Sequence, residues 1–243
     1  MMIDFPETKV VSIPCTPLEG MEIVHLSDLH IDHKTPIKVL EKLVTIVNSI
    51  SPDIVVITGD IIDTNPLDIA DKLMLFKKIC CPIYFVSGNH DLRWLSLLVT
   101  LLSSETVHFM DNRYHCLYYQ DQPYYLAGIA DRFANFFGIK RTSNTLESIN
   151  SHKIPLIFLA HQPKDYRLAL RLGSSVFLTG HTHGGQIFPF HLLVRMVQPF
   201  LNGIHHKDQM YIYVSRGFGT WGVPFRLLAP SEVTHIKMCA EMV

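Results

Sequence analysis

The sequence has no apolar run of the roughly 20 residues that a helix needs to cross a bilayer. Residues 1–14 contain Asp4, Glu7 and Lys9 and lack the apolar core of a signal peptide. An excess of charge of one sign is also missing, since 21 Lys and Arg are balanced by 22 Asp and Glu. Such a balance gives no electrostatic footprint for a nucleic acid. We therefore expect a protein that is soluble or bound to a membrane surface, with no nucleic-acid partner.

Cysteine is scarce, and the CxxC spacing of zinc and redox motifs is absent. The five cysteines are Cys15, Cys80, Cys81, Cys116 and Cys239. We expect all five to be reduced and structural, which favours a cytoplasmic location. Because 48% of the residues are hydrophobic, peripheral attachment to the inner face of the cytoplasmic membrane stays open.

Short apolar runs alternate with helical patterns in the first third of the chain. The runs at 23–27, 54–58 and 83–87 are the expected strands. Residues 36–50 carry apolar side chains at helical spacing, and Asn65-Pro66 begins a second helix. This alternation predicts right-handed βαβ units with a parallel sheet. Ligands of such sheets gather outside the carboxyl ends of the strands.

The remaining patterns predict more strands and no separate domain. Three short strands at 107–109, 114–119 and 124–129 suggest an antiparallel meander. Buried strands are expected at 156–160 and 176–179, and closing strands of a second sheet at 210–215 and 233–237. With 243 residues and no repeat or linker, we expect residues 1–243 to form a single domain.

Polar blocks follow five of these expected strands. They are Asp28-Leu-His30, Gly59-Asp60-Ile-Ile-Asp63, Gly88-Asn89-His90-Asp91, His161-Gln-Pro163 and Gly180-His181-Thr-His183. Asp, Asn and His without thiolates favour Mn²⁺, Fe²⁺ or Zn²⁺ over softer metals. Seven ligands suit two ions roughly 3.5–4 Å apart, a pair that can activate a bridging hydroxide and clamp a phosphoryl oxygen. Asp60, in the middle of the order, is the natural bridge between them.

The five blocks, in this order, resemble those of the calcineurin-like metallophosphoesterase family. Gly184-Gly-Gln186, Gln198-Pro-Phe-Leu201 and the stretch Tyr213–Gly222 are similar to a bacterial branch of that family. That branch includes membrane-associated phosphodiesterases and the chlamydial-type UDP-2,3-diacylglucosamine pyrophosphatase of lipid A synthesis. The resemblance implies an α/β fold, a four-layer αββα sandwich of two mixed β-sheets flanked by helices.

The resemblance also implies a role for each site residue. Asp28, His30 and His183 would hold the first metal, Asn89, His161 and His181 the second, and Asp60 both. Two Mn²⁺ ions are the expected occupants. His90 would assist the leaving oxygen, and Asp91 would orient His90. Asp63 would act behind the ligands or cap the following turn.

These residues predict a dinuclear-metal phosphohydrolase that cleaves a phosphodiester or pyrophosphate bond of a small-molecule or lipid-linked substrate. UDP-2,3-diacylglucosamine pyrophosphatase activity, an inactive metal-binding scaffold and a nuclease are the alternatives. Protein serine/threonine phosphatases of the family carry Asp-Arg-Gly and Asn-His-Glu where this chain has Asp63-Thr-Asn65 and Asn89-His-Asp91. That departure argues against a phosphoprotein substrate.

Two arginines and two apolar stretches each have two possible roles. Arg216 and Arg226 flank a Gly-rich turn, where they would bind substrate phosphate or form ion pairs. The apolar stretches 93–102 and 187–201 would be ordinary core or a rim that touches acyl chains or a bilayer. His25 is expected in the core, and His205-His206 as a solvated loop pair.

Overall fold

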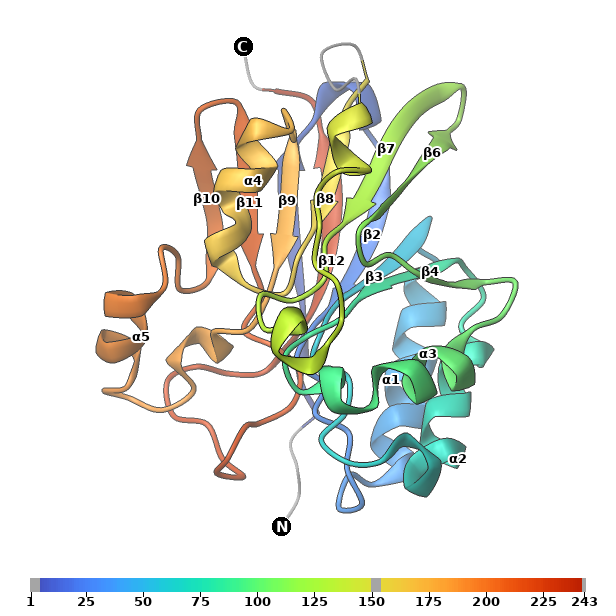
Figure 1. The fold of residues 1–243 in the computed structure, drawn as a ribbon, viewed down its shortest axis with the longest axis vertical. Coiled ribbons are helices and arrows are strands. Elements are labelled where there is room, and N and C mark those ends of the chain that lie inside the picture. Colours follow the sequence, from blue (N-terminus) through green and yellow to red (C-terminus); the bar gives the residue numbers. More distant parts are fainter. Residues whose placement is uncertain (1–4, 150–153, 242–243) are drawn as a thin grey trace.

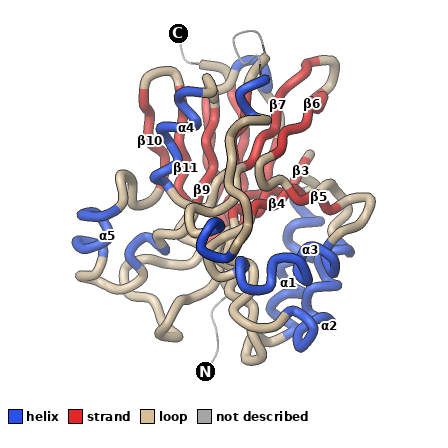
Figure 2. The backbone as a smooth tube through the Cα atoms, viewed as in Figure 1, coloured by secondary structure: helices blue, strands red, loops and turns tan. Residues whose placement is uncertain are grey.

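The computed structural model describes residues 5–149 and 154–241. Two six-stranded mixed sheets pack face to face, with helices on their outer sides (Figures 1 and 2). Between the sheets lies an apolar layer that includes Ile23, Val56, Leu126 and Leu178. The predicted four-layer sandwich of two mixed sheets is thereby confirmed.

The first sheet has the order β1-β12-β2-β3-β4-β5. Its strands are β1 (Glu7–Pro14), β12 (Glu232–Cys239), β2 (Glu22–Leu26), β3 (Ile54–Thr58), β4 (Ile83–Val86) and β5 (Val107–Phe109). Strands β2 to β5 pair in parallel, as the alternation of strands and helices predicted. β12 runs antiparallel to β2, which makes the sheet mixed.

Helices α1 (Ile37–Ile50), α2 (Ala70–Leu73) and α3 (Leu95–Leu102) cover the outer face of the first sheet (Figure 1). α1 buries Leu40, Leu43, Val44 and Val47 at helical spacing. The helix predicted to begin at Asn65-Pro66 does begin there, and the Asn65 side chain accepts a hydrogen bond from the Leu67 amide. It continues as 3₁₀ turns on both sides of α2. Leu95, Leu98 and Leu102 of α3 are buried, so one face of residues 93–102 belongs to the core while Arg93, Ser96 and Thr100 are exposed.

The second sheet has the order β10-β11-β9-β8-β7-β6. Its strands are β10 (Gly203–Lys207), β11 (Met210–Val214), β9 (Val176–Thr179), β8 (Leu156–Leu159), β7 (Gln122–Gly128) and β6 (Arg113–Tyr119). The four central strands are parallel, and an antiparallel hairpin closes each edge. Helix α4 (Tyr166–Arg171) packs on its outer face, whereas α5 (His191–Val197) buries no residue. None of the helices within the described ranges has the length and apolarity needed to cross a membrane.

Three sequence predictions about these sheets were wrong. The meander does not form, because β5 pairs with β4 in the first sheet while β6 and β7 form a hairpin in the second. Residues 233–237 lie in β12 of the first sheet, between β1 and β2. His205 and His206 lie in the edge strand β10 rather than in a loop. Apolar patterning identifies strands but carries no information on which sheet a strand joins, because both sheets bury similar side chains.

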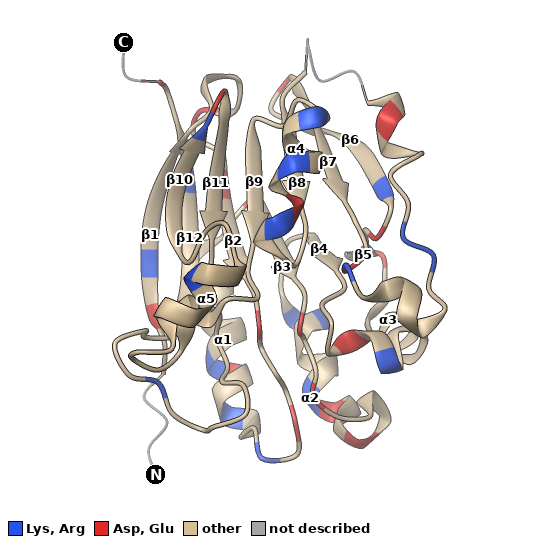
Figure 3. Cartoon of the chain, turned by 60° about the vertical axis from the view of Figure 1, so that its left-hand side comes forward, with Lys and Arg blue, Asp and Glu red and all other residues tan. Residues whose placement is uncertain are grey.

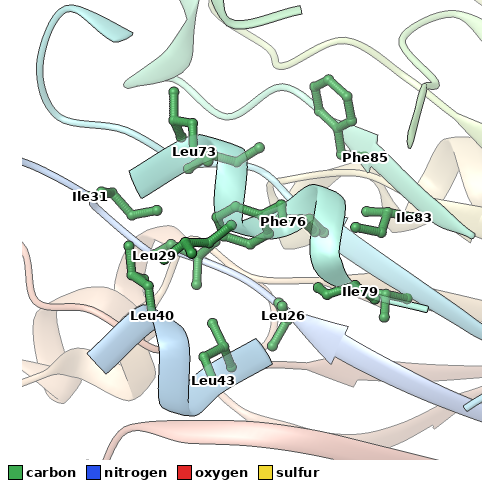
Figure 4. Close-up of a cluster of buried hydrophobic side chains, with 14 of the residues drawn as sticks. Leu26, Leu29, Ile31, Leu40, Leu43, Leu73, Phe76, Ile79, Ile83 and Phe85 are labelled. Atoms are coloured by element: carbon green, nitrogen blue, oxygen red, sulfur yellow. The ribbon is translucent and has the colours of Figure 1, made fainter. Parts of the chain in front are cut away.

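The layer between the first sheet and its helices gives a test of packing. Leu43 of α1 lies close to Leu26 and Leu40 in this layer and is fully buried (Figure 4). We expect Leu43→Ala to lower the free energy of unfolding by about 2–5 kcal/mol, since it removes buried methyl groups and leaves a cavity. Denaturant unfolding measures this loss. Leu67→Ala is the matched control because Leu67 is 57% exposed. Equal losses in the two variants would contradict the packing described here.

Candidate metal centre

Five strand ends bring the polar blocks to one edge of the sandwich. Strands β2, β3 and β4 lead into Asp28, Asp60 and Asn89, and strands β8 and β9 lead into His161 and His181. The two sheets deliver these side chains from opposite sides, so ligands far apart in sequence meet between them. This is the expected position of a site in sheets with parallel strands.

The backbone around these residues is in an uncommon conformation. Asp28, His30, Asp60, His181 and His183 have φ angles of 51°, 47°, 53°, 71° and 50°. Such left-handed values are uncommon for residues with a side chain, and they cluster at functional sites. Hydrogen bonds between the loops fix this geometry, for example from the Asp28 amide to the Gly59 carbonyl (3.0 Å).

Two glycines allow the loops to approach each other. A Cβ at Gly88 would collide with the Asp60 backbone and carboxylate, and a Cβ at Gly180 would collide with Ser27 and the Asp28 carboxylate. Glycine at these positions is therefore required by close approach. Gly88 and Gly180 are thus part of the polar blocks because no larger residue would fit there.

One cluster of ligand atoms comprises Asp28, His30 and His183. His30 Nε2 lies 3.1 Å from His183 Nε2, which lies 3.4 Å from Asp28 Oδ1. The other ring nitrogen of His30, Nδ1, lies 2.7 Å from Asp63 Oδ1. Because the carboxylate can only accept, Nδ1 donates there, which leaves Nε2 to face the cluster.

A second cluster comprises Asp60, His161 and His181, with Asn89 beside it. His161 Nε2 lies 3.2 Å from Asp60 Oδ2, 3.1 Å from Asn89 Oδ1 and 3.1 Å from His181 Nδ1. His161 Nδ1 donates to the Thr58 carbonyl at 2.7 Å, which leaves Nε2 to face these acceptors. Burial acts to lower the pKa of His161, but the Asp60 carboxylate outweighs it and raises the pKa well above its usual value, so the ring carries a proton when no ion is bound. Acceptor atoms that face one another repel unless a proton or a cation lies between them. This donor set therefore fits a divalent metal.

Asp60 lies between the two clusters, since it also forms a group of possible ligands with His30 and His90. Its Oδ2 lies 3.2 Å from His161 Nε2 and 3.8 Å from His30 Nε2. Burial by itself raises the pKa of Asp60, but the neighbouring His161 and His30 outweigh this effect and lower the pKa to about 2. Burial lowers the pKa of the His181 imidazole to about 4. An ionised carboxylate beside a neutral imidazole is the state in which both bind metal.

Asp63 holds two histidines at once. Its Oδ1 lies 2.7 Å from His30 Nδ1 and 2.8 Å from His90 Nδ1. Burial acts to lower the pKa of His90, but the hydrogen bond to Asp63 prevails and raises it. Of the two roles predicted for Asp63, the structure favours the first. Its carboxylate contacts the far side of a candidate metal ligand and orients the imidazole ring.

The prediction that Asp91 orients His90 is wrong. The Asp91 carboxylate accepts hydrogen bonds from the amides of Ile61 (2.8 Å), Ile62 (3.1 Å) and Gly88 (2.8 Å). Burial raises the pKa of this carboxyl to about 7, and the Asp60 charge adds to the rise. Asp91 therefore joins two ligand loops, because its side chain points into the backbone and away from the His90 ring. Asp91 was predicted because it follows His90 in the sequence, but the carboxylate that contacts the His90 ring is that of Asp63.

Arg226 is partly buried, and its guanidinium bonds to the protein. Its guanidinium donates to the carbonyls of Arg216 (2.8 Å), Gly219 (3.0 Å from Nε) and Ala229 (3.2 Å), and Nη2 lies 3.0 Å from His183 Nδ1. These contacts occupy its donors, so they favour support of His183 over the predicted contact with substrate phosphate. Arg216 is partly exposed, with Nε 3.9 Å from Glu232 Oε2. Its substrate-binding role stays a prediction.

A pocket of about 440 Å³ opens over the two clusters. Its floor contains Asp60, Asn89, His90, His181 and His183. Its walls are largely apolar and come from α5 with the segment before it and from residues 221–223: Ile187, Phe190, Val194, Val197, Trp221 and Val223. Gln186 joins these walls, because its side chain bonds to both the amide and the carbonyl of Trp221 (2.8 Å each). The sequence signalled the apolar stretch at 187–201 but gave no sign that Trp221 faces it.

Comparison with known proteins agrees with this geometry. Residues 21–185 match the family described as calcineurin-like phosphoesterase. The chain belongs to that family. A metallophosphoesterase of Campylobacter jejuni is 35% identical over 96% of this chain and 63% of its own length. A UDP-2,3-diacylglucosamine pyrophosphatase of Chlamydia trachomatis is 24% identical over 92% of this chain and 85% of its own length. The chain thus spans less than two thirds of the Campylobacter metallophosphoesterase.

Solved structures share the fold. A 5'-nucleotidase precursor of Thermus thermophilus superposes with a TM-score of 0.56 at 12% identity, covering 90% of this chain and 54% of that one. A dimetal phosphatase of Danio rerio superposes with a TM-score of 0.55 at 10% identity, covering 82% of this chain and 88% of that one. At such low identity the likeness concerns the sandwich alone.

The shared position of Asp60 gives a test of the metal centre. We expect Asp60→Ala to lose both ions while remaining folded, because its carboxylate reaches both clusters. Elemental analysis after dialysis measures the metal content, and circular dichroism checks the fold. Asp121→Ala, which removes an exposed carboxylate from a β6–β7 turn, is the control and should keep the parent's content. A folded Asp60→Ala protein with two ions per chain would refute the bridging role.

Proposed function

We propose that this protein hydrolyses a phosphodiester or pyrophosphate bond at a dinuclear metal centre. The observation that supports this most strongly is the convergence of six candidate ligand side chains around Asp60. Asp28, His30 and His183 would hold one ion, Asn89, His161 and His181 the other, and Asp60 both. When bound, two divalent ions supply an activated water and neutralise charge on the phosphoryl group. Mn²⁺ is the proposed occupant, and the same ligands suit Fe²⁺ or Zn²⁺.

His90 would deliver a proton to the leaving oxygen. It lies in the pocket floor, and its Nδ1 is held by Asp63. Nε2 is therefore the ring nitrogen left for the substrate. A raised pKa keeps the ring protonated at higher pH than a free imidazole, which suits a general acid.

The role of His90 is tested with bis(p-nitrophenyl) phosphate and with an ester that has a poorer leaving group, both with added Mn²⁺. We expect His90→Ala to keep its metal content and to lose about 10²–10⁴-fold in kcat, with the greater loss on the poorer leaving group. Lost metal would show that His90 is a ligand instead. No turnover by the parent protein on any phosphoester would leave the inactive scaffold as the better description.

The substrate is proposed to be an amphiphilic phosphate. The side chains that surround the pocket mouth include Phe190 (60% exposed), Trp221 (58%) and Val223 (41%). Core packing does not account for this exposure, in contrast to residues 93–102. The Chlamydia relative is named for a diacylated sugar nucleotide, so UDP-2,3-diacylglucosamine pyrophosphatase activity is the narrower form of this proposal.

Substitution at the pocket wall separates an apolar substrate from a small polar one. We expect Phe190→Ser to raise KM for an acylated substrate by about tenfold or more, since burial of an apolar group on a Phe side chain contributes roughly 1.5–3 kcal/mol. KM for a short soluble ester should stay unchanged. Tyr118→Ser removes a 70% exposed ring from β6 and is the control. Equal effects of Phe190→Ser on both substrates would refute the amphiphilic substrate while leaving the hydrolytic function intact.

A further inference from the structure

A second cleft, of about 900 Å³, shares Val197 and Gln198 with the metal pocket. It is lined by Arg132 and residues 141–144, by residues 164–171 in and before α4, and by the end of α5 with the residues after it. Its lining contains six cationic side chains: Arg132, Arg141, Lys164, Arg167, Arg171 and Arg195. The cations of α4 and α5 lie on the side of the molecule turned toward the viewer in Figure 3. We call this feature the basic cleft.

The basic cleft holds more positive than negative charge. Asp165 is the one carboxylate among the described residues that line the cleft. It is 3% exposed and pairs with Arg132 (2.8 Å) and Arg141 (2.6 Å). Lys164, Arg167 and Arg195 form no ion pair with any described residue, and all three are exposed. A net charge of −1 for the whole chain conceals this local excess.

Apolar side chains of α5 continue the same surface. Met196 lines the basic cleft and is 81% exposed, and Leu192 and Leu193 are 55% and 56% exposed. None of the α5 residues is buried, so the helix stands out from the fold without a covering layer. Contiguous exposed apolar side chains mark interaction sites. Cations beside them are typical of a segment that lies in the interface of a bilayer.

We propose that the basic cleft and α5 dock this protein on a bilayer that contains anionic phospholipids. Headgroup phosphates would enter the cleft, where guanidinium groups bind phosphate in a bidentate manner. The side chains of Leu192, Leu193 and Met196 would reach the boundary of the acyl chains. The metal pocket would then open at the membrane surface, since α5 forms its wall. Single-stranded nucleic acid fits less well, because it requires exposed stacking rings among the cations, and the single ring of the cleft, Tyr166, packs on Phe200.

Vesicle sedimentation tests this proposal without turnover, so its outcome is independent of the hydrolytic function. The probes are phosphatidylcholine vesicles with and without phosphatidylglycerol, an anionic lipid that gives the bilayer a negative surface potential. The parent protein should bind the anionic vesicles more tightly, and salt should weaken this binding. Each cation near such a surface contributes roughly fivefold to partitioning. Lys164→Glu/Arg195→Glu should therefore reduce the partition coefficient by about 30-fold or more.

Lys34→Glu/Lys38→Glu is the matched control, since it changes the net charge by the same amount as the cleft variant. Lys34 precedes α1, Lys38 lies in its first turn, and both are exposed. It should bind nearly as the parent does. Leu192→Ser/Met196→Ser should also weaken binding, with less dependence on salt. Equal binding of the parent to neutral and anionic vesicles, or equal loss in the two charge variants, would overturn the proposal. Binding of an oligonucleotide through Lys164 and Arg195 without vesicle binding would assign the cleft to nucleic acid instead.

Discussion

The repulsion between acceptor atoms around Asp60 is the constraint on which the rest of the structure depends. Asp28 and Asp60 are buried carboxylates, and ring nitrogens of His30, His161 and His181 lie close to their oxygens. Such an arrangement needs positive charge at its centre, and without an ion the proton that Asp60 stabilises on the buried His161 ring supplies it. The fold must therefore hold these groups in place by other interactions until metal binds.

Those interactions come from the backbone and from groups behind the ligands. The left-handed φ angles of the ligand residues are strained, and hydrogen bonds between loops together with a dense apolar core maintain them. Asp63, Asp91 and Arg226 are the side chains that fix the loops and rings. The Asp91 carboxylate and the Arg226 guanidinium use most of their hydrogen-bonding capacity inside the protein. Asp63 holds both of its histidine partners through Oδ1.

The surface beside the centre divides into two chemical environments that meet at α5. One side of the helix faces the metal pocket with Phe190 and Val194, and the other faces the basic cleft with Arg195 and Met196. An amphiphilic phosphate and an anionic bilayer would require both properties next to each other. The two proposals therefore converge on one short helix, although each is tested by a separate measurement.

The sequence by itself determined the parallel βαβ units, the strand-end positions of the polar blocks and the family, because local periodicity and fixed spacing carry that information. It did not determine that β12 inserts between β1 and β2, or that Asp63 rather than Asp91 contacts His90. Sheet membership and side-chain direction depend on contacts between segments far apart in the chain. The basic cleft was hidden for the same reason: its six cations come from three separate segments, and only the tertiary structure places them together.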